Sequence, residues 1–212
     1  MKKIRIGIST RIIHSENYID DRDGLSHDWP SLLEKIKIIP ILIPNSLLEI
    51  EQFLEDMKLD GIILSGGDSI GEFPLRDKNE NKIIEYAINK KMPIFGVCRG
   101  MQIINEFFGG DVIKTMDKKH VGKSHNIIVN KEKIFSFLNT EKIVVNSFHN
   151  NIIIEEKLGR NLKAIAKDAN DESIEAFIHS SYPIMGTMWH PERMKNENNY
   201  NLIKIFFKKE KL

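Results

Sequence analysis

The only cysteine of the chain, Cys98, lies in the stretch GVCRG, between an apolar run and a run with helical spacing. A Gly-x-Cys-x-Gly turn between a strand and a helix has the pattern of the strained turn that presents a serine nucleophile in Gly-x-Ser-x-Gly. Gly96 and Gly100 remove side chains where the strand and the helix crowd the turn. The positive end of the helix would favour a thiolate. On the turn alone, a small buried core residue is an equally good interpretation of Cys98.

A histidine and a carboxylate near the C-terminus supply what a cysteine nucleophile needs. The stretch MWHPE contains His190 and Glu192, separated by Pro191. Cysteine chemistry requires a histidine as base and acid, and the histidine requires an orienting group. We expect His190 to end a strand, so that Glu192, two residues later, lies on the same side, with Pro191 stiffening the spacing. Together with Cys98, the pair predicts nucleophilic catalysis rather than a chance pair on an exposed strand end.

The first half of the chain alternates between short apolar runs and amphipathic runs. This alternation predicts a parallel sheet covered on both faces by helices, with a ligand site at the carboxyl edge of the strands, where Cys98 would lie. The expected strands are residues 4–8, 38–43, 61–64 and 93–97. The expected helices are residues 29–36, with Asp28 as N-cap, residues 47–57 and 83–88, and a helix after Cys98 that stops at Gly109.

The second half has strand-like runs without long helices between them. We expect strands at residues 126–129, 142–145, 173–179 and 184–190, a hairpin turn at 180–183 and a final helix at 199–209. The predicted fold class is therefore α/β, one domain over residues 1–212, with a mostly parallel central sheet flanked by helices and antiparallel hairpin strands in the C-terminal half. Residues 20–28 and 71–81 are the most polar stretches and are expected to be loops.

Composition excludes several classes of function. The chain has 212 residues, which suits one sizeable core, and a formal net charge of +1, which gives no electrostatic reason to bind nucleic acid or an anionic membrane. No apolar run approaches the roughly 20 residues of a membrane span. We expect a cytoplasmic protein.

Metal ligands are also not evident in the sequence. One cysteine excludes an intramolecular disulfide and a Cys-x-x-Cys zinc site. The remaining histidines outside the motifs show no ligand spacing, so no metal and no cofactor is predicted; they are His14, His27, His120, His125 and His179.

Four segments, in this order and at these spacings, resemble the class I glutamine amidotransferase-like family over essentially the whole chain. They are ILSGGD (63–68), GVCRGMQIIN (96–105), VNSFHN (145–150) and MWHPE (188–192). The resemblance implies that Cys98 attacks the carbonyl of a γ-glutamyl amide and forms a γ-glutamyl thioester. His190 would protonate the leaving amine and later activate water, while Glu192 holds the imidazole in the productive tautomer.

The tetrahedral intermediate of this chemistry needs fixed donors for its oxyanion. The backbone N–H of Arg99, directly after the nucleophile, is one, and the resemblance places the other in the Gly66–Gly67 turn, at Gly67. The resemblance also matches four residues to positions that line the pocket for the glutamyl group: Gln102, Ser147, Phe148 and His149. Gly66 is expected to bind the substrate as well, because glycine lets the backbone approach it closely, and the alternative for Gly66–Gly67 is an ordinary turn after a strand. For Gln102 the alternative is simple helix packing, and for His149 it is a structural histidine.

Three functions remain open within this resemblance. VCRGMQ and VNSFHN are more similar to the hydrolase branch, the peptidase C26 type, whose members cleave γ-glutamyl amides without a partner. The alternative enzyme is a glutaminase subunit that delivers ammonia to a separate synthetase, because no synthetase domain is present. The third function is that of a degenerate binding module, against which the intact Cys98, His190 and Glu192 argue.

Two further stretches narrow the choice of possible substrates. DRDGLSHDW and SIGEFPLRD resemble a smaller group encoded with nucleotide-sugar and surface-polysaccharide enzymes, one member type of which hydrolyses γ-glutamyl-CDP-amidate to glutamate and cytidine diphosphoramidate. Such a leaving group carries phosphates, which guanidinium groups bind bidentately. The sequence therefore proposes Arg22 and Arg76 at the mouth of the pocket. The alternative is that each arginine pairs with its neighbouring aspartate, Asp23 or Asp77, and braces its loop.

Overall fold

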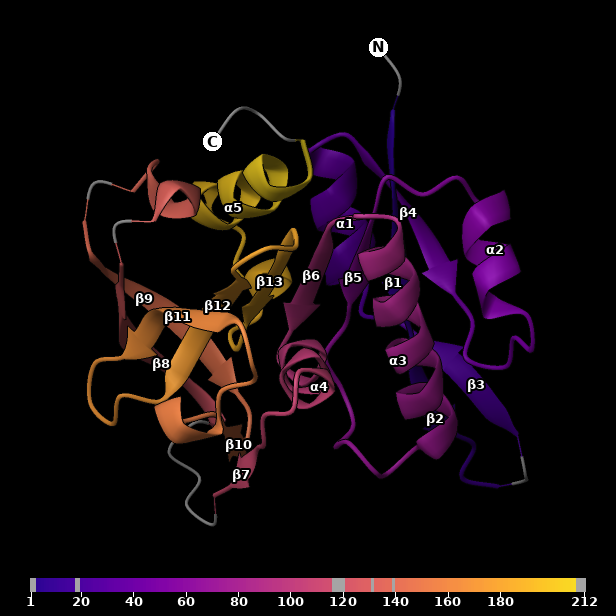
Figure 1. The fold of residues 1–212 in the computed structure, drawn as a ribbon, viewed down its shortest axis with the longest axis horizontal. Helices are drawn as coiled ribbons and strands as arrows, with labels where there is room; N and C mark the ends of the chain where they lie inside the picture. The colour runs from indigo at the N-terminus through magenta and orange to yellow at the C-terminus, as the bar shows by residue number, and fades with distance from the viewer. Residues whose placement is uncertain (1–2, 18–19, 116–120, 131, 139, 209–212) are drawn as a thin grey trace.

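The computed structural model describes residues 3–17, 20–115, 121–130, 132–138 and 140–208. Within them a nine-stranded sheet runs through the molecule in the order β4-β1-β5-β6-β13-β12-β11-β8-β9 (Figure 1). Its strands are β1 (Ile4–Ser9), β4 (Ile38–Ile43), β5 (Gly61–Leu64), β6 (Ile94–Val97), β8 (Val121–Val129), β9 (Lys142–Phe148), β11 (Leu162–Asp168), β12 (Ile174–His179) and β13 (Ile184–Thr187).

The sheet is parallel from β4 to β13 and antiparallel from β13 to β9. In the parallel part, β5 and β6 are buried along their whole length, as apolar strands covered on both faces should be. The antiparallel pairing of β12 with β13 confirms the hairpin expected around residues 180–183. The carboxyl ends of β1, β5, β6 and β13 meet at one edge, which is where an open α/β sheet places its ligand site.

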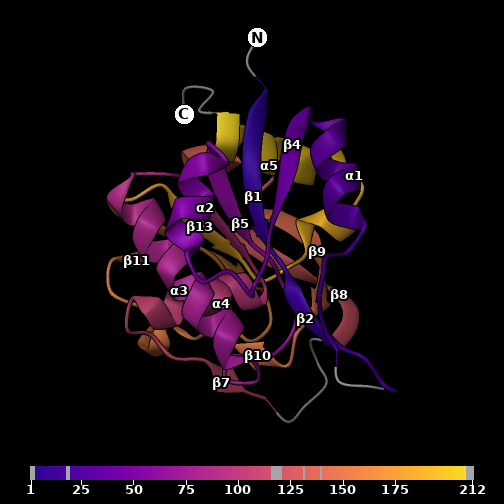
Figure 2. The same cartoon turned by 90° about the vertical axis from the view of Figure 1, so that its right-hand side faces the viewer.

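Helices cover both faces of the sheet (Figure 2). On one face α1 (Asp28–Lys35) and α5 (Glu197–Lys208) pack in a core that includes Trp29 and Phe95. On the other face α2 (Ile50–Asp56), α3 (Pro74–Asn89) and α4 (Arg99–Phe107) pack in a core that includes Leu54 and Met101. The predicted fold class is confirmed.

Two predicted loops prove to be regular structure. Most of residues 71–81 belongs to α3, which begins at Pro74 and includes the predicted helix 83–88. Proline is pre-organised for the first helical turn. The first half of this helix has no apolar stripe to reveal it, because its inward side chains are Arg76, Asn79 and Glu80. In residues 20–28, β3 (Asp21–Gly24) pairs with β2 (Arg11–His14) in a hairpin that leaves the sheet directly after β1.

Smaller differences concern the ends of elements. The last strand ends at Thr187 rather than His190, and β8 and β9 are longer than expected. Strand β11 and the short pair β7 (Ile113–Lys114) and β10 (Asn151–Ile152) were not expected. Lys209, the predicted last residue of the final helix, is outside the described residues. None of the helices in the described ranges has the length and apolar character needed to span a membrane.

Candidate functional site

Cys98 occupies the strained turn that the sequence predicted. It follows β6 and caps α4 with φ 52° and ψ −107°, a conformation that few residues other than glycine adopt. Its backbone N–H donates to the carbonyl of Thr187 at 2.8 Å, which ties the turn to the end of β13. A Cβ atom on Gly100 would lie 2.0 Å from the carbonyl oxygen of Leu64, and one on Gly96 would lie 2.5 Å from that of Gly100. Only glycines allow strand and helix to approach this closely.

His190 and Glu192 form a buried pair. The Nδ1 atom of His190 lies 2.6 Å from Oε1 of Glu192. The expected extended geometry is wrong, however, because the residues after His190 form the 3-10 turn η4 (Pro191–Arg193), which suits the fixed φ of proline. Asn146 on β9 fixes the backbone of His190, since it donates to the carbonyl at 2.8 Å and accepts from the N–H at 2.8 Å.

The charge state of His190 follows from its surroundings. Burial disfavours the imidazolium, but hydrogen bonds and opposite charge from Cys98 and Glu192 outweigh burial and raise the pKa of His190 to about 9. A Cβ atom on Gly66 would lie 2.7 Å from Cε1 of His190 and 3.6 Å from Cβ of Cys98. Imidazole, thiol and Gly66 therefore meet at one point, with a histidine that carries a proton to donate at neutral pH.

The two predicted oxyanion donors flank this point. Gly67 has φ 131°, and a Cβ atom there would lie 2.9 Å from Nη1 of Arg76, so the turn requires glycine. Arg99 is the first residue of α4, where a backbone N–H has no acceptor within the helix. The described geometry leaves their role as oxyanion donors a prediction.

Arg76 does not lie at the mouth of the pocket, and the expected position is wrong. Its side chain is completely buried, because α3 carries it inward. The guanidinium donates to the carbonyls of Ser65 and Gly66 at 2.9 and 3.1 Å, and pairs with Glu80 at 3.1 Å and with Asp68 at 3.3 Å. Arg76 therefore stabilises the Gly66–Gly67 turn from the protein interior and does not face solvent.

The side chain of Arg99 joins the same network. Its guanidinium pairs with Asp77 and with Glu80, and Glu80 also accepts from the hydroxyl of Ser9 at 2.7 Å. The network links α3, α4 and the end of β1, all of which border the site. The aspartate that was expected to brace Arg76 thus pairs with Arg99 instead.

Arg22 also differs from its expected position. It lies on β3 with its side chain 60% exposed and pairs with Asp20 at 2.7 Å, not with Asp23. Asp23 accepts hydrogen bonds from Thr10 and Asn45. Arg22 is not among the described residues that line the pocket beside His190.

Of the residues expected to bind the glutamyl group, Phe148 contacts the ring of His190, and Gln102 and Ser147 are buried. The ring of Phe148 packs edge-on against that of His190, with centroids 5.9 Å apart. Gln102 is buried and donates to the sulfur of Met188 at 3.6 Å, two residues before His190. Ser147 on β9 is fully buried. Their role in binding remains a prediction.

His149 belongs to a buried cluster of ionisable groups. Its Nδ1 lies 2.9 Å from the carbonyl of Asn151 and its Nε2 lies 3.6 Å from Glu175. Within the described part of the chain, His125, Asp168 and Glu175 bring three possible metal-ligand atoms within 4.8 Å of one another. Linear spacing could not reveal this group because its members lie on three strands.

The same cluster is explained by charge pairing. Burial opposes charge on both groups, yet Glu175 raises the pKa of His125, while His125 and His149 lower the pKa of Glu175. A buried carboxylate between two histidines is thereby neutralised. His120, also considered as a ligand from sequence, is outside the described residues.

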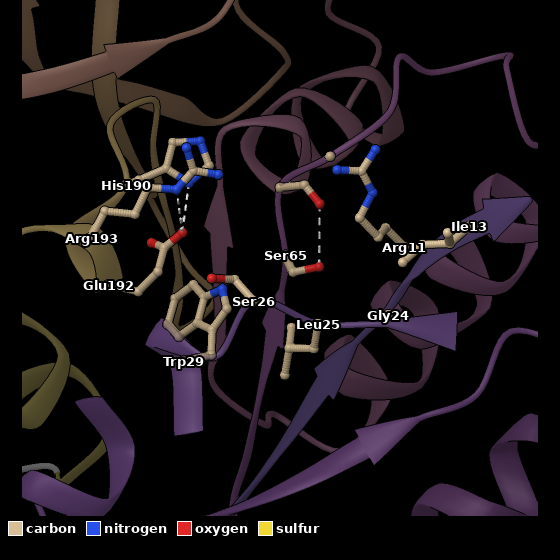
Figure 3. A pocket seen from close by; sticks show the side chains of 12 residues that line it. Arg11, Ile13, Gly24, Leu25, Ser26, Trp29, Ser65, His190, Glu192 and Arg193 are labelled. Carbon is tan, nitrogen blue, oxygen red and sulfur yellow. Dashed lines mark hydrogen bonds and ion pairs between the residues drawn. The ribbon is translucent and has the colours of Figure 1, made fainter. Parts of the chain in front are cut away.

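A pocket of about 310 Å³ opens beside His190 (Figure 3). Most of its lining was not predicted from the sequence, although MWHPE runs directly into Arg193, and Arg11 follows the first strand at the same sheet edge. The residues that line it are Arg11, Ile13, Gly24, Leu25, Ser26, Trp29, Ser65, Gly66, Gly67, His190, Glu192 and Arg193.

Known proteins resemble this chain along nearly its whole length. Residues 18–210 match the model of the family described as glutamine amidotransferase class-I. The chain is 34% identical over 209 residues to gamma-glutamyl-CDP-amidate hydrolase of Campylobacter jejuni, covering 95% of this chain and 96% of that protein. It is 32% identical over 179 residues to a subunit of the glutamine-hydrolyzing GMP synthase of Methanococcus aeolicus, covering 83% and 87%. The crystal structure of a protein assigned as a GMP synthase subunit from Thermoplasma acidophilum matches with a TM-score of 0.76 and 25% identity, covering 98% of this chain and 94% of that one.

Proposed function

Because the chain belongs to the class I glutamine amidotransferase family, we propose that it hydrolyses a γ-glutamyl amide through a thioester on Cys98, with His190 and Glu192 as partners. One observation carries this proposal: the buried His190, 2.6 Å from Glu192, lies beside the strained turn that presents Cys98. A thiol, an imidazole and an orienting carboxylate are the groups that acyl transfer to cysteine requires.

The reaction has two halves. In the first, His190 already holds the proton of the Cys98 thiol, Sγ of Cys98 bonds to the γ-carbonyl carbon, and the backbone N–H groups of Gly67 and Arg99 stabilise the oxyanion. His190 then donates the proton to the leaving nitrogen, and the C–N bond breaks. In the second half, water loses a proton to His190 and attacks the thioester. The C–S bond breaks, glutamate leaves, and His190 keeps the proton that it took from water, which restores the starting state.

The substrate that we propose is γ-glutamyl-CDP-amidate, whose hydrolysis gives glutamate and cytidine diphosphoramidate. Similarity over nearly the full length of the Campylobacter jejuni hydrolase of this compound supports the choice. The sequence resemblance links such hydrolases to surface-polysaccharide synthesis. The reaction needs no partner protein.

An activity assay of the purified protein, without any partner protein, tests this proposal. Incubated with γ-glutamyl-CDP-amidate, the protein should release glutamate, measured enzymatically, together with cytidine diphosphoramidate, identified by its phosphorus resonances. Glutamine under the same conditions should react more slowly. Absence of glutamate release from the nucleotide compound would contradict the proposal.

The similarity to GMP synthase subunits favours a second candidate, a glutaminase that supplies ammonia to a synthetase. This candidate shares the chemistry at Cys98 but expects glutamine as substrate and little turnover until a partner binds. The two functions separate in the same assay. Glutamine hydrolysis that exceeds hydrolysis of the nucleotide compound, and that rises when a synthetase is added, would favour the second candidate.

A further inference from the structure

Two arginines line the pocket that contains His190. Arg11 comes from β2, and Arg193 from η4, three residues after the histidine. Figure 3 shows His190, Glu192 and Arg193 grouped on one side of the view and Arg11 with Ile13 on the other. The side chains of Arg11 and Arg193 are 49% and 39% exposed, so both side chains are partly accessible from solvent.

Each guanidinium is anchored by only part of its donor set. Arg11 pairs through Nη2 with Asp68, which is itself only 5% exposed and held by Arg76 at 3.3 Å. Arg193 lies over the ring of Phe148, 4.6 Å from its centroid, and its Nε is 3.8 Å from Oε1 of Glu192. A guanidinium has five N–H donors in a fixed fork, so one ion pair or one ring contact orients it without using the whole fork.

The position of the phosphates in the leaving group determines where positively charged side chains are needed. In a γ-glutamyl phosphoramidate, phosphorus is bonded directly to the nitrogen that leaves. His190 must reach that nitrogen to protonate it, so the first phosphate of the leaving group lies in the space next to His190. The neutral amide of glutamine places no charge there, whereas a diphosphate places at least two negative charges.

We propose that Arg11 and Arg193 form the subsite for the phosphate groups of the leaving group. This inference rests on the proposed function and replaces Arg22 and Arg76 as the phosphate-binding arginines. The two guanidinium groups approach the pocket from different elements, and arginine matches phosphate oxygens bidentately. Arg193 would take the phosphate next to the leaving nitrogen, because it follows His190 in the same turn, and Arg11 would take the phosphate beyond it.

A purely structural role makes a different prediction. Arg11 packs against the Gly66–Gly67 turn, since a Cβ atom on Gly67 would lie 3.2 Å from Cβ of Arg11. If Arg11 served only to brace Asp68 and this turn, its loss would slow hydrolysis of every γ-glutamyl amide to the same extent. A phosphate subsite instead affects the charged substrate selectively.

The experiment compares two substrates with the same glutamyl group, γ-glutamyl-CDP-amidate and the neutral γ-glutamyl methylamide. We expect the ratio of kcat/KM for the charged substrate over the neutral one to fall at least about tenfold in Arg11→Gln and in Arg193→Gln, the loss of about one good contact. The inhibition constant of cytidine diphosphate should rise by a similar factor. Arg22→Gln is the matched control, because its guanidinium is 60% exposed and lies outside the pocket lining.

The outcomes separate the inference from the function on which it rests. If the wild type hydrolyses γ-glutamyl-CDP-amidate but the ratio and the inhibition constant of both arginine variants equal those of the wild type, the subsite is wrong and the function stands. Equal losses on both substrates also overturn the subsite. If the wild type does not release glutamate from the nucleotide compound at all, the proposed function fails, and the subsite fails with it.

Discussion

The Nδ1 atom of His190 lies 2.6 Å from Oε1 of Glu192, across a 3-10 turn that begins at the intervening proline. Because both side chains are buried, the carboxylate acts on the imidazole with little screening by solvent. Because Nδ1 contacts Glu192, the Nε2 side of the ring faces Gly66 and Cys98. A Cβ atom on Gly66 would lie 3.6 Å from Nε2. Glu192 therefore orients the histidine and, together with Cys98, keeps it charged.

The first prediction concerns pH. Since the pKa of His190 is raised to about 9, kcat/KM should fall as pH rises through that value, when the imidazole loses the proton that the proposed mechanism delivers to the leaving nitrogen. Glu192→Gln removes a group that raises this pKa, so the basic limb of the profile should move to lower pH. A basic limb that stays in place in Glu192→Gln would contradict the assigned coupling.

The same shift affects stability. The folded pKa of His190 lies above the ordinary value of 6.5, so the ionised pair stabilises the fold fully below about pH 6.5, and this contribution is lost as pH rises through about 9. Denaturant unfolding of the wild type and Glu192→Gln at pH 6 and pH 10 measures it. The difference in free energy of unfolding between the two proteins should shrink at the higher pH.

The second prediction concerns Gly66. Its added Cβ atom in Gly66→Ala would lie 2.7 Å from Cε1 of His190, so the ring must move. Displacement of a reacting group by about 1 Å can cost roughly 100-fold in rate, and we expect kcat/KM to fall by about that factor. Gly71→Ala is the control: nothing lies within 4 Å of its Cβ, and its φ of 88° should lower stability while activity is kept. Equal activity of the two variants would show that Gly66 does not position the histidine.

The third prediction concerns the buried network behind the turn. Arg76→Met leaves Glu80 and Asp68 with less compensating charge in a buried site, which typically costs about 3–5 kcal/mol of folding free energy. Arg22→Met removes an exposed pair and should cost less than about 1 kcal/mol. Denaturant unfolding measures both. A cost for Arg76→Met as small as that for Arg22→Met would contradict the structural role.

Much of the fold was predictable because its signals are local. The parallel strands are short apolar runs between amphipathic helices, and the turn at Cys98 is visible in its two glycines. Strand β11 and the hairpin of β2 and β3 were not predicted, because their residues do not alternate regularly between apolar and polar side chains. The start of α3 was not predicted because its buried face carries Arg76 and Glu80. Apolar residues therefore do not recur there at the spacing that indicates a helix.

Site residues that lie in short sequence motifs were predictable. Site residues that become neighbours only when the chain folds were not. GVCRG and MWHPE identified Cys98, His190 and Glu192 as residues to be brought together. The partners of Arg76 were not predictable, because Ser65 and Asp68 become its neighbours only when α3 packs on the sheet. The two arginines of the pocket wall come from segments separated by most of the chain, and sequence spacing does not indicate that they share a pocket.

The most direct test of the account is the covalent intermediate. Wild-type protein mixed rapidly with γ-glutamyl-CDP-amidate and quenched in acid should carry a γ-glutamyl group on the peptide that contains Cys98, located by mass spectrometry. Cys98→Ala should fold, as judged by its thermal unfolding, and should show neither adduct nor turnover. Turnover that survives in Cys98→Ala, or a glutamyl group on another residue, would contradict the thioester mechanism.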